Sequence, residues 1–120
     1  MRLLSRVLIG CLPWMAGAPT ATPPSCAEFV WKVGRVIERL EGVRPALNNP
    51  GGLSRKGRPL RFRTRAAGET AMLRLIERLM RDRTPEQFFA VWAPDGQGYA
   101  GKASRMLRID PKEPMRRHCY

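Results

Sequence analysis

The sequence predicts a mainly α-helical (α+β) domain of about four helices, with a short β-hairpin or an ordered loop after the first helix. Three observations support this fold class. Apolar residues recur at helical spacing in several segments, Ser and Thr stand at the expected helix starts, and a segment rich in Gly and Pro interrupts the pattern. At 120 residues, 43% of them hydrophobic, the chain is long enough for one domain with a small core.

The first helix is predicted to begin after Ser25, because Ser25-Cys26-Ala27-Glu28 has the pattern of a capping box. Gly42 should end this helix, and Pro45 prevents it from resuming. Between these limits one apolar stripe has helical spacing and comprises Phe29, Val33, Val36, Ile37 and Leu40.

Residues 43–66 are predicted to be largely irregular, because they are rich in Gly, Pro and Asn. Within them Leu60-Arg61-Phe62-Arg63 alternates like a short strand. Residues 53–55 are placed to pair with it across Lys56-Gly57-Arg58. We therefore expect a small hairpin or an ordered loop here.

Three more helices are predicted in the second half of the chain. One spans about residues 64–83 and has an apolar stripe that includes Met72 and Ile76. The next begins at Thr84-Pro85-Glu86-Gln87, a capping box with Pro at the first helical position, and ends before Pro94. The last spans about residues 99–107. We expect the domain to cover residues 26–110, with residues 111–120 as a basic tail.

Residues 1–25 are predicted to be a signal peptide or an unstructured N-terminal segment. Arg2 and Arg6 precede an apolar run over residues 7–18, which is typical of an export signal and short for a membrane span. Cys11 lies in a sequence that resembles a lipoprotein box. An exported protein would reside in the periplasm or cell envelope. If the segment is not a signal, the protein would be cytoplasmic or phage-associated.

Basic residues dominate the charge, with 22 Lys and Arg against 10 Asp and Glu and a net charge of +12. Such a chain attracts polyanions, whether nucleic acid, anionic lipid or the anionic polymers of a bacterial envelope. After export, Cys26 and Cys119 would remain near the two ends of the mature chain. They could form a bridge or stay as two free thiols. His118 is the only histidine, so no zinc-type ligand set and no cofactor are predicted.

Glu41 is the acidic residue that the first helix is predicted to hold partly out of water. On a helical wheel it lies about 120° from Phe29, on the shoulder of the apolar stripe, whereas Glu38 lies about 180° away and should face solvent. Partial burial and the exposed carbonyls of the last turn both favour the protonated form of a carboxyl group. A general acid needs this property. The alternative is a solvated Glu at a helix end.

The segment Asn48-Asn49-Pro50-Gly51-Gly52 suggests a ligand-binding loop. Gly51 and Gly52 would let backbone approach a ligand without intervening side chains. Asn48 and Asn49 could contact the hydroxyl and N-acetyl groups of a sugar, or could instead form only Asx-turns. Tyr99 could line the same cleft or belong to the core.

Five motifs occur in one order: EG-x-x-P with NNPGGL, RF-x-x-x-x-AGE-x-A, TPEQF with WAP, GY, and IDPKEP. Together they resemble phage and prophage proteins with a lysozyme-like domain, of the lytic transglycosylase and muramidase superfamily. The resemblance covers about residues 36–114. It implies a lysozyme-like fold that cleaves or binds peptidoglycan glycan strands, with Glu41 as the catalytic acid. Gly52 departs from the usual pattern, which has an Asn there.

The distribution of acids bears on the mechanism. No Asp or Glu occurs between Gly42 and Gly68. Glycosidases that use two carboxyls need them roughly 5–9.5 Å apart, so a second carboxyl would have to come from Glu69, Glu86, Asp95 or another distant residue. The sequence therefore favours a scheme with one acid, as in lytic transglycosylases.

Two alternatives remain open at the level of sequence. A basic run could bind nucleic acid or another polyanion, or could simply be a solvated surface. Alternatively, a lysozyme-like protein without activity could bind glycan or serve as a phage structural protein. In each case we expect a monomer. The basic run comprises Arg55, Lys56, Arg58, Arg61, Arg63 and Arg65.

Overall fold

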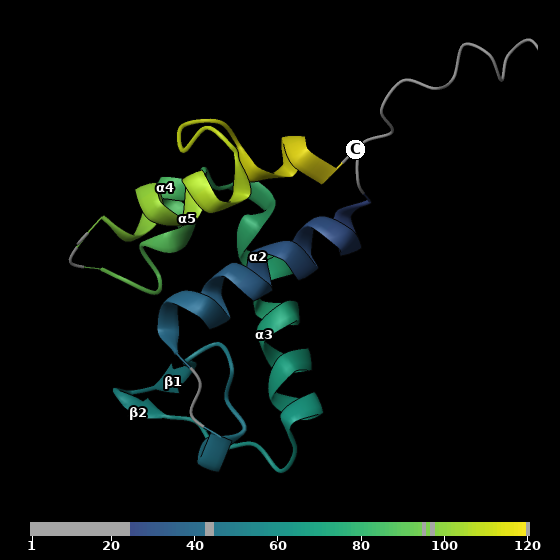
Figure 1. Cartoon of the computed structure of the whole chain (residues 1–120), viewed down its shortest axis with the longest axis vertical. Coiled ribbons are helices and arrows are strands. Elements are labelled where there is room, and N and C mark those ends of the chain that lie inside the picture. Colours follow the sequence, from purple (N-terminus) through teal and green to yellow (C-terminus); the bar gives the residue numbers. More distant parts are fainter. Residues whose placement is uncertain (1–24, 43–44, 95, 97, 120) are drawn as a thin grey trace, which may run out of the picture.

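The computed structural model describes residues 25–42, 45–94, 96 and 98–119. It is mainly helical with a small antiparallel sheet, as the sequence predicts (Figure 1). The α-helices are α2 (Cys26–Glu41), α3 (Arg65–Leu79), α4 (Pro85–Phe89) and α5 (Tyr99–Leu107). The strands are β1 (Ser54–Arg55) and β2 (Arg58–Pro59), and short 3₁₀ helices cover Pro45–Leu47, Met80–Asp82 and Met115–Cys119.

Both ends of α2 lie where the sequence predicts, but only the Ser25 half of the predicted capping box forms. The Ser25 hydroxyl accepts a hydrogen bond from the backbone N–H of Glu28 at 3.1 Å. Gly42 ends the helix with a φ of +81°, and its N–H donates to the carbonyl of Glu38 at 3.0 Å. A positive φ is accessible to Gly at low cost, which explains why the helix ends here and leaves Glu41 in its last turn.

The later helices differ in length from the prediction. The helix expected over residues 64–83 is capped by Thr64, but it tightens into a 3₁₀ turn from Met80. The capping box of Thr84 and Gln87 is present, yet α4 ends at Phe89 and the chain continues in turns. The predicted α5 is confirmed.

The hairpin is present, but its second strand is Arg58–Pro59 and not the predicted Leu60-Arg61-Phe62-Arg63, which forms no strand. The turn is also tighter than expected. Ser54 pairs with Pro59 and Arg55 with Arg58, so the turn consists of only Lys56 and Gly57. Both turn residues have positive φ, +51° and +79°. This is the backbone that a two-residue hairpin connection requires.

One hydrophobic core joins the helices. Helix α2 packs against α3, α5 and the C-terminal 3₁₀ helix, while the hairpin lies beyond the C-terminal end of α2 (Figure 1). The fully buried large side chains include Val33, Ile37, Met72, Ile76, Phe88, Phe89 and Met115.

The segment expected to be a basic tail packs against the domain. Met115 is buried, and Cys119 forms a disulfide with Cys26 at the start of α2. His118 lies beside Phe29, with ring centroids 5.4 Å apart. The bridge therefore joins the two ends of the described chain, which the sequence left as one of two alternatives.

The N-terminal prediction cannot be compared with the fold, because residues 1–24, including Cys11, lie outside the described residues. Over the part of the chain that the structure describes, no helix is both long enough and apolar enough to cross a bilayer.

Candidate functional site

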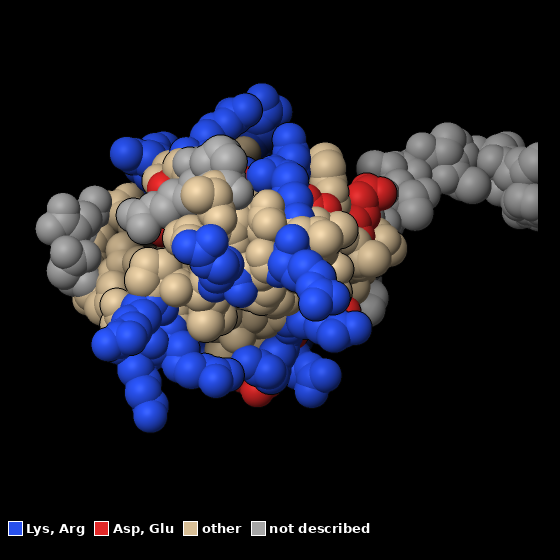
Figure 2. Space-filling view, turned by 90° about the horizontal axis from the view of Figure 1, so that it is seen from below, with Lys and Arg blue, Asp and Glu red and all other residues tan. Residues whose placement is uncertain are grey.

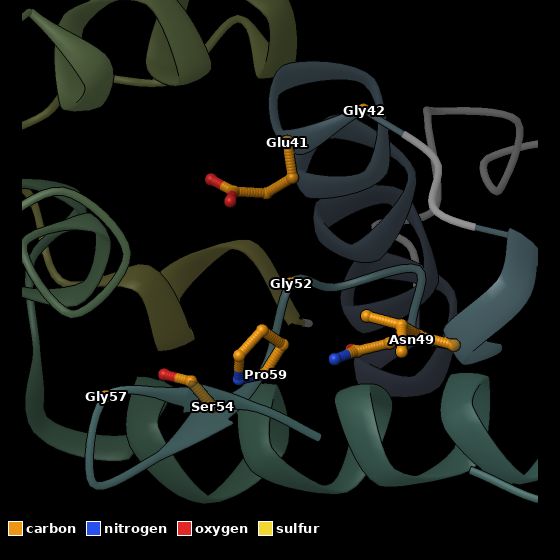
Figure 3. Close-up of a pocket in the computed structure, with 8 residues that line it drawn as sticks. Glu41, Gly42, Asn49, Gly52, Ser54, Gly57 and Pro59 are labelled. Carbon is orange, nitrogen blue, oxygen red and sulfur yellow. The ribbon is translucent and has the colours of Figure 1, made fainter. Parts of the chain in front are cut away.

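A pocket of about 200 Å³ lies at the C-terminal end of α2 (Figure 3). Its walls come from the helix end, the Asn-Pro-Gly loop and the hairpin. The lining residues are Glu41, Gly42, Leu47, Asn49, Gly52, Ser54, Gly57 and Pro59. Three segments separated in sequence thus meet around one carboxylate.

Glu41 is half-buried at this pocket, on the side of the helix that the sequence predicted. Its side chain extends from the helix end toward the opening above Gly52, Ser54 and Pro59 (Figure 3). A methyl group on Gly52 would lie 2.8 Å from Glu41 Oε1. Loop backbone therefore approaches the carboxylate directly, whereas the sequence suggested only that it would approach a ligand.

Tyr99 lies near Glu41 on the side of the protein interior. Its ring packs beside Phe89, with centroids 5.8 Å apart, and it is not among the described residues that line the pocket. Its hydroxyl oxygen is buried, and no described group forms a hydrogen bond of normal geometry with it. Burial, followed by the hydrogen-bonding approach and negative charge of Glu41, raises the pKa of the Tyr99 hydroxyl far above its usual value. The Tyr99 hydroxyl is therefore neutral at physiological pH.

The prediction that Glu38 faces solvent is wrong. Glu38 is 7% exposed, lies 3.2 Å from Arg35 and 3.7 Å from Arg65, and is covered where α3 begins. The prediction assumed that only the apolar stripe of α2 is buried, but α3 covers a wider part of the surface of α2. Glu38 therefore pairs with two guanidinium groups, and Glu41 is the acidic residue that reaches the pocket.

Glycine at two positions allows the loop to pack tightly. A side chain at Gly68 of α3 would overlap the backbone carbonyl of Asn48, and a methyl group at Gly51 would lie 2.8 Å from Met72. The indole N–H of Trp92 also donates to the carbonyl of Gly51 at 2.8 Å. These contacts hold the loop against α3 and against the turn that follows α4. The motifs AGE and WAP contain Gly68 and Trp92, but neither residue was predicted as a site residue.

The side-chain amides of Asn48 and Asn49 form hydrogen bonds within the protein. Asn49 is 3% exposed and donates to the carbonyls of Leu53 and Leu60 at 2.8 and 2.9 Å. Its oxygen accepts from the N–H of Leu53 at 2.9 Å. Asn48 donates both of its amide hydrogens to the carbonyls of Phe62 and Arg63. Neither amide retains a free N–H for a sugar, so their main role is to join the loop to the hairpin.

The pocket lining contains one carboxylate. Glu69 and Glu86, which the sequence offered as partners, are not among the lining residues, and Asp95 lies outside the described residues. Nor do the described residues include any group of three or more His, Cys, Asp or Glu placed to hold a metal ion. The chemistry that this arrangement offers is proton transfer by Glu41.

The predicted basic run separates into two groups. Arg65 pairs with Glu38, and Arg61 donates to the carbonyl of Ala46 at 3.4 Å. The other four basic side chains are exposed and form no ion pair with a described carboxylate; they are Arg55, Lys56, Arg58 and Arg63. The hairpin end of the molecule shows many basic and few acidic side chains (Figure 2).

Comparisons of the chain with protein-family models, curated proteins and solved structures found no significant match.

Proposed function

We propose that this protein is a lysozyme-like, peptidoglycan-active protein that cleaves glycan strands with Glu41 as its only acid. The observation that carries the proposal is the position of Glu41, half-buried at a pocket whose opposite walls are loop and hairpin. The order of motifs in the sequence supports the choice of substrate. Export to the periplasm or envelope, where this substrate occurs, is part of the same proposal.

In the proposed reaction, the Glu41 carboxyl group donates its proton to the glycosidic oxygen as the bond from that oxygen to C1 breaks. The C6 hydroxyl oxygen of the same muramoyl residue then bonds to C1. The hydroxyl proton passes to the Glu41 carboxylate, which restores the acid. The products are a 1,6-anhydro sugar end and a free hydroxyl end, so one residue serves as acid and then as base.

The surroundings of Glu41 fit this double role. Glu41 lies in the last turn of α2, and the backbone of Gly52 lies against its carboxyl group, so one side of that group is shielded from solvent. The neutral Tyr99 hydroxyl is buried near the carboxylate, and a small side-chain shift would let it donate to the anion once the proton has left. A two-carboxyl mechanism would require a second acid at the pocket, and the described lining offers none.

The test replaces Glu41 with Gln and measures both clearing of purified cell walls and release of 1,6-anhydro products. We expect the wild type to clear the walls and the variant to be slower by about 10² or more, the usual contribution of a general acid. Glu77→Gln is the matched control, because Glu77 is exposed on α3 outside the pocket lining.

Two results would contradict the proposal. If neither wild type nor variant clears the walls while both sediment with them, the protein is a non-catalytic glycan-binding or phage structural protein. Reducing ends in place of 1,6-anhydro ends would indicate hydrolysis by water and therefore a different mechanism.

A further inference from the structure

The hairpin beside the pocket concentrates positive charge at a cost in stability. Arg55 and Arg58 lie directly opposite each other in its register, with Lys56 between them in the turn. Like charges in directly opposed positions repel. None of the three forms an ion pair with a described carboxylate, and the sequence has no acid from residue 43 to residue 67.

The turn residue Lys56 adds a second cost. It has a φ of +51°, in the left-handed region, where Asn or Gly would be placed with less strain. Strained backbone positions cluster at functional sites, where a particular side chain is needed. The hairpin thus places three cations together despite their charge repulsion and the backbone strain at Lys56.

The same hairpin forms a wall of the Glu41 pocket. Ser54, Gly57 and Pro59 line the pocket, and side chains alternate along a strand. Ser54 and Pro59 are opposed to each other on one face, so Arg55 and Arg58 lie on the other face, away from the cavity. A glycan strand that continued past the pocket along the hairpin would carry its branching peptides to these exposed cations.

We infer that the hairpin cations bind carboxylate groups on the peptides that branch from the glycan strand, so that the site selects peptide-bearing, negatively charged strands. This inference rests on the proposed function. Carboxylates match the fork-like geometry of guanidinium groups. The hairpin has no aromatic side chain on which bases could stack, so it lacks a feature that single-stranded nucleic acid sites use.

The experiment compares two wall preparations that differ only in charge. Both are purified walls with acetylated amines; in one, the carboxylates are also converted to amides with a carbodiimide. The measured quantities are the initial rate of glycan cleavage and the fraction of protein that sediments with the walls, each at low and high salt. We expect wild type to favour the untreated walls by roughly ten-fold at low salt, and high salt to remove the preference.

The variant is Arg55→Gln, Lys56→Gln and Arg58→Gln together. It should lose the preference and retain its rate on amidated walls. The control, Arg74→Gln, Arg78→Gln and Arg81→Gln, removes the same charge from exposed positions on and just after α3, and should retain the preference. Melting curves confirm that both proteins are folded.

Each outcome is decisive for the inference. Equal action of wild type on both wall preparations, or equal loss in the two triple variants, would overturn it while leaving the proposed function intact. If no protein cleaves either preparation, the cleavage proposal fails and the sedimentation data still decide the role of the hairpin. Hairpin-dependent retention of DNA without any preference between the walls would identify a nucleic-acid surface instead.

Discussion

The carboxylate of Glu41 lies against the Cα of Gly52, so closely that a methyl group on that carbon would stand 2.8 Å from Oε1. Gly52 also has a φ of +62°, which disfavours any L side chain there. Two residues eleven positions apart are thus fitted to each other at the pocket. In the resemblance proposed from the sequence, this is also the position at which the expected Asn is replaced by Gly.

Gly52→Ala should displace the Glu41 carboxylate. We expect the rate of wall cleavage to fall by roughly ten-fold or more, because small misplacements of a catalytic group are costly. The free energy of unfolding should fall by about 1 kcal/mol from the left-handed backbone alone. Gly96→Ala is the control: Gly96 has a φ of +86° and open space around its Cβ position. Equal rates in the two variants would exclude the displacement.

Tyr99→Phe should change how stability depends on pH. The pKa of Tyr99 is raised in the folded protein above its ordinary value of 10.0, so folding binds this proton more tightly. Its contribution is complete below about pH 10 and is lost as the pH rises toward the folded pKa. The difference in melting temperature between the wild type and the Phe variant should be constant from pH 7 to 9. Above pH 10 the wild type should lose more stability. Parallel curves throughout would contradict this.

Removing the bridge between Cys26 and Cys119 should destabilise the fold. The bridge spans 93 positions, and closing a loop of that size is worth about 4 kcal/mol in the chain-entropy model. We expect urea unfolding of the Cys26→Ser, Cys119→Ser protein to show a loss of this order. Reductant should lower the stability of the wild type similarly and leave the double variant unchanged. A stable, reductant-insensitive wild type would indicate that the thiols do not pair.

Asn49→Ala should cost more stability than Asn48→Ala. Asn49 is buried with three hydrogen bonds to residues 53 and 60, and its loss leaves these backbone groups unpaired. We expect roughly 2–3 kcal/mol from urea unfolding. Asn48 is less buried and makes two bonds, so its loss should cost less. If Asn49→Ala weakens wall binding without lowering stability, the sugar-contacting role suggested by the sequence would be restored.

Local patterns predicted the elements of this fold because a few neighbouring residues are enough to form them. Ser25 and Gly42 set the ends of α2, and Thr84 with Gln87 caps α4, through hydrogen bonds that span three or four residues. The spacing of apolar residues in α2 likewise placed Glu41 on the shoulder of the buried face. The existence of the hairpin, though not its two-residue turn, followed from the same kind of local signal.

Tertiary packing decided what surrounds those elements. The helical wheel showed on which side of α2 Glu38 lies, but not how much of the surface of α2 is covered by α3. The burial of Glu38 therefore could not be predicted. The contact of Gly52 with Glu41, the use of Asn49 by the hairpin and the packing of Met115 all join segments distant in sequence. By itself the sequence determined which residues carry the candidate chemistry. Only the fold decided which of them face the pocket, because burial depends on neighbours that no local pattern specifies.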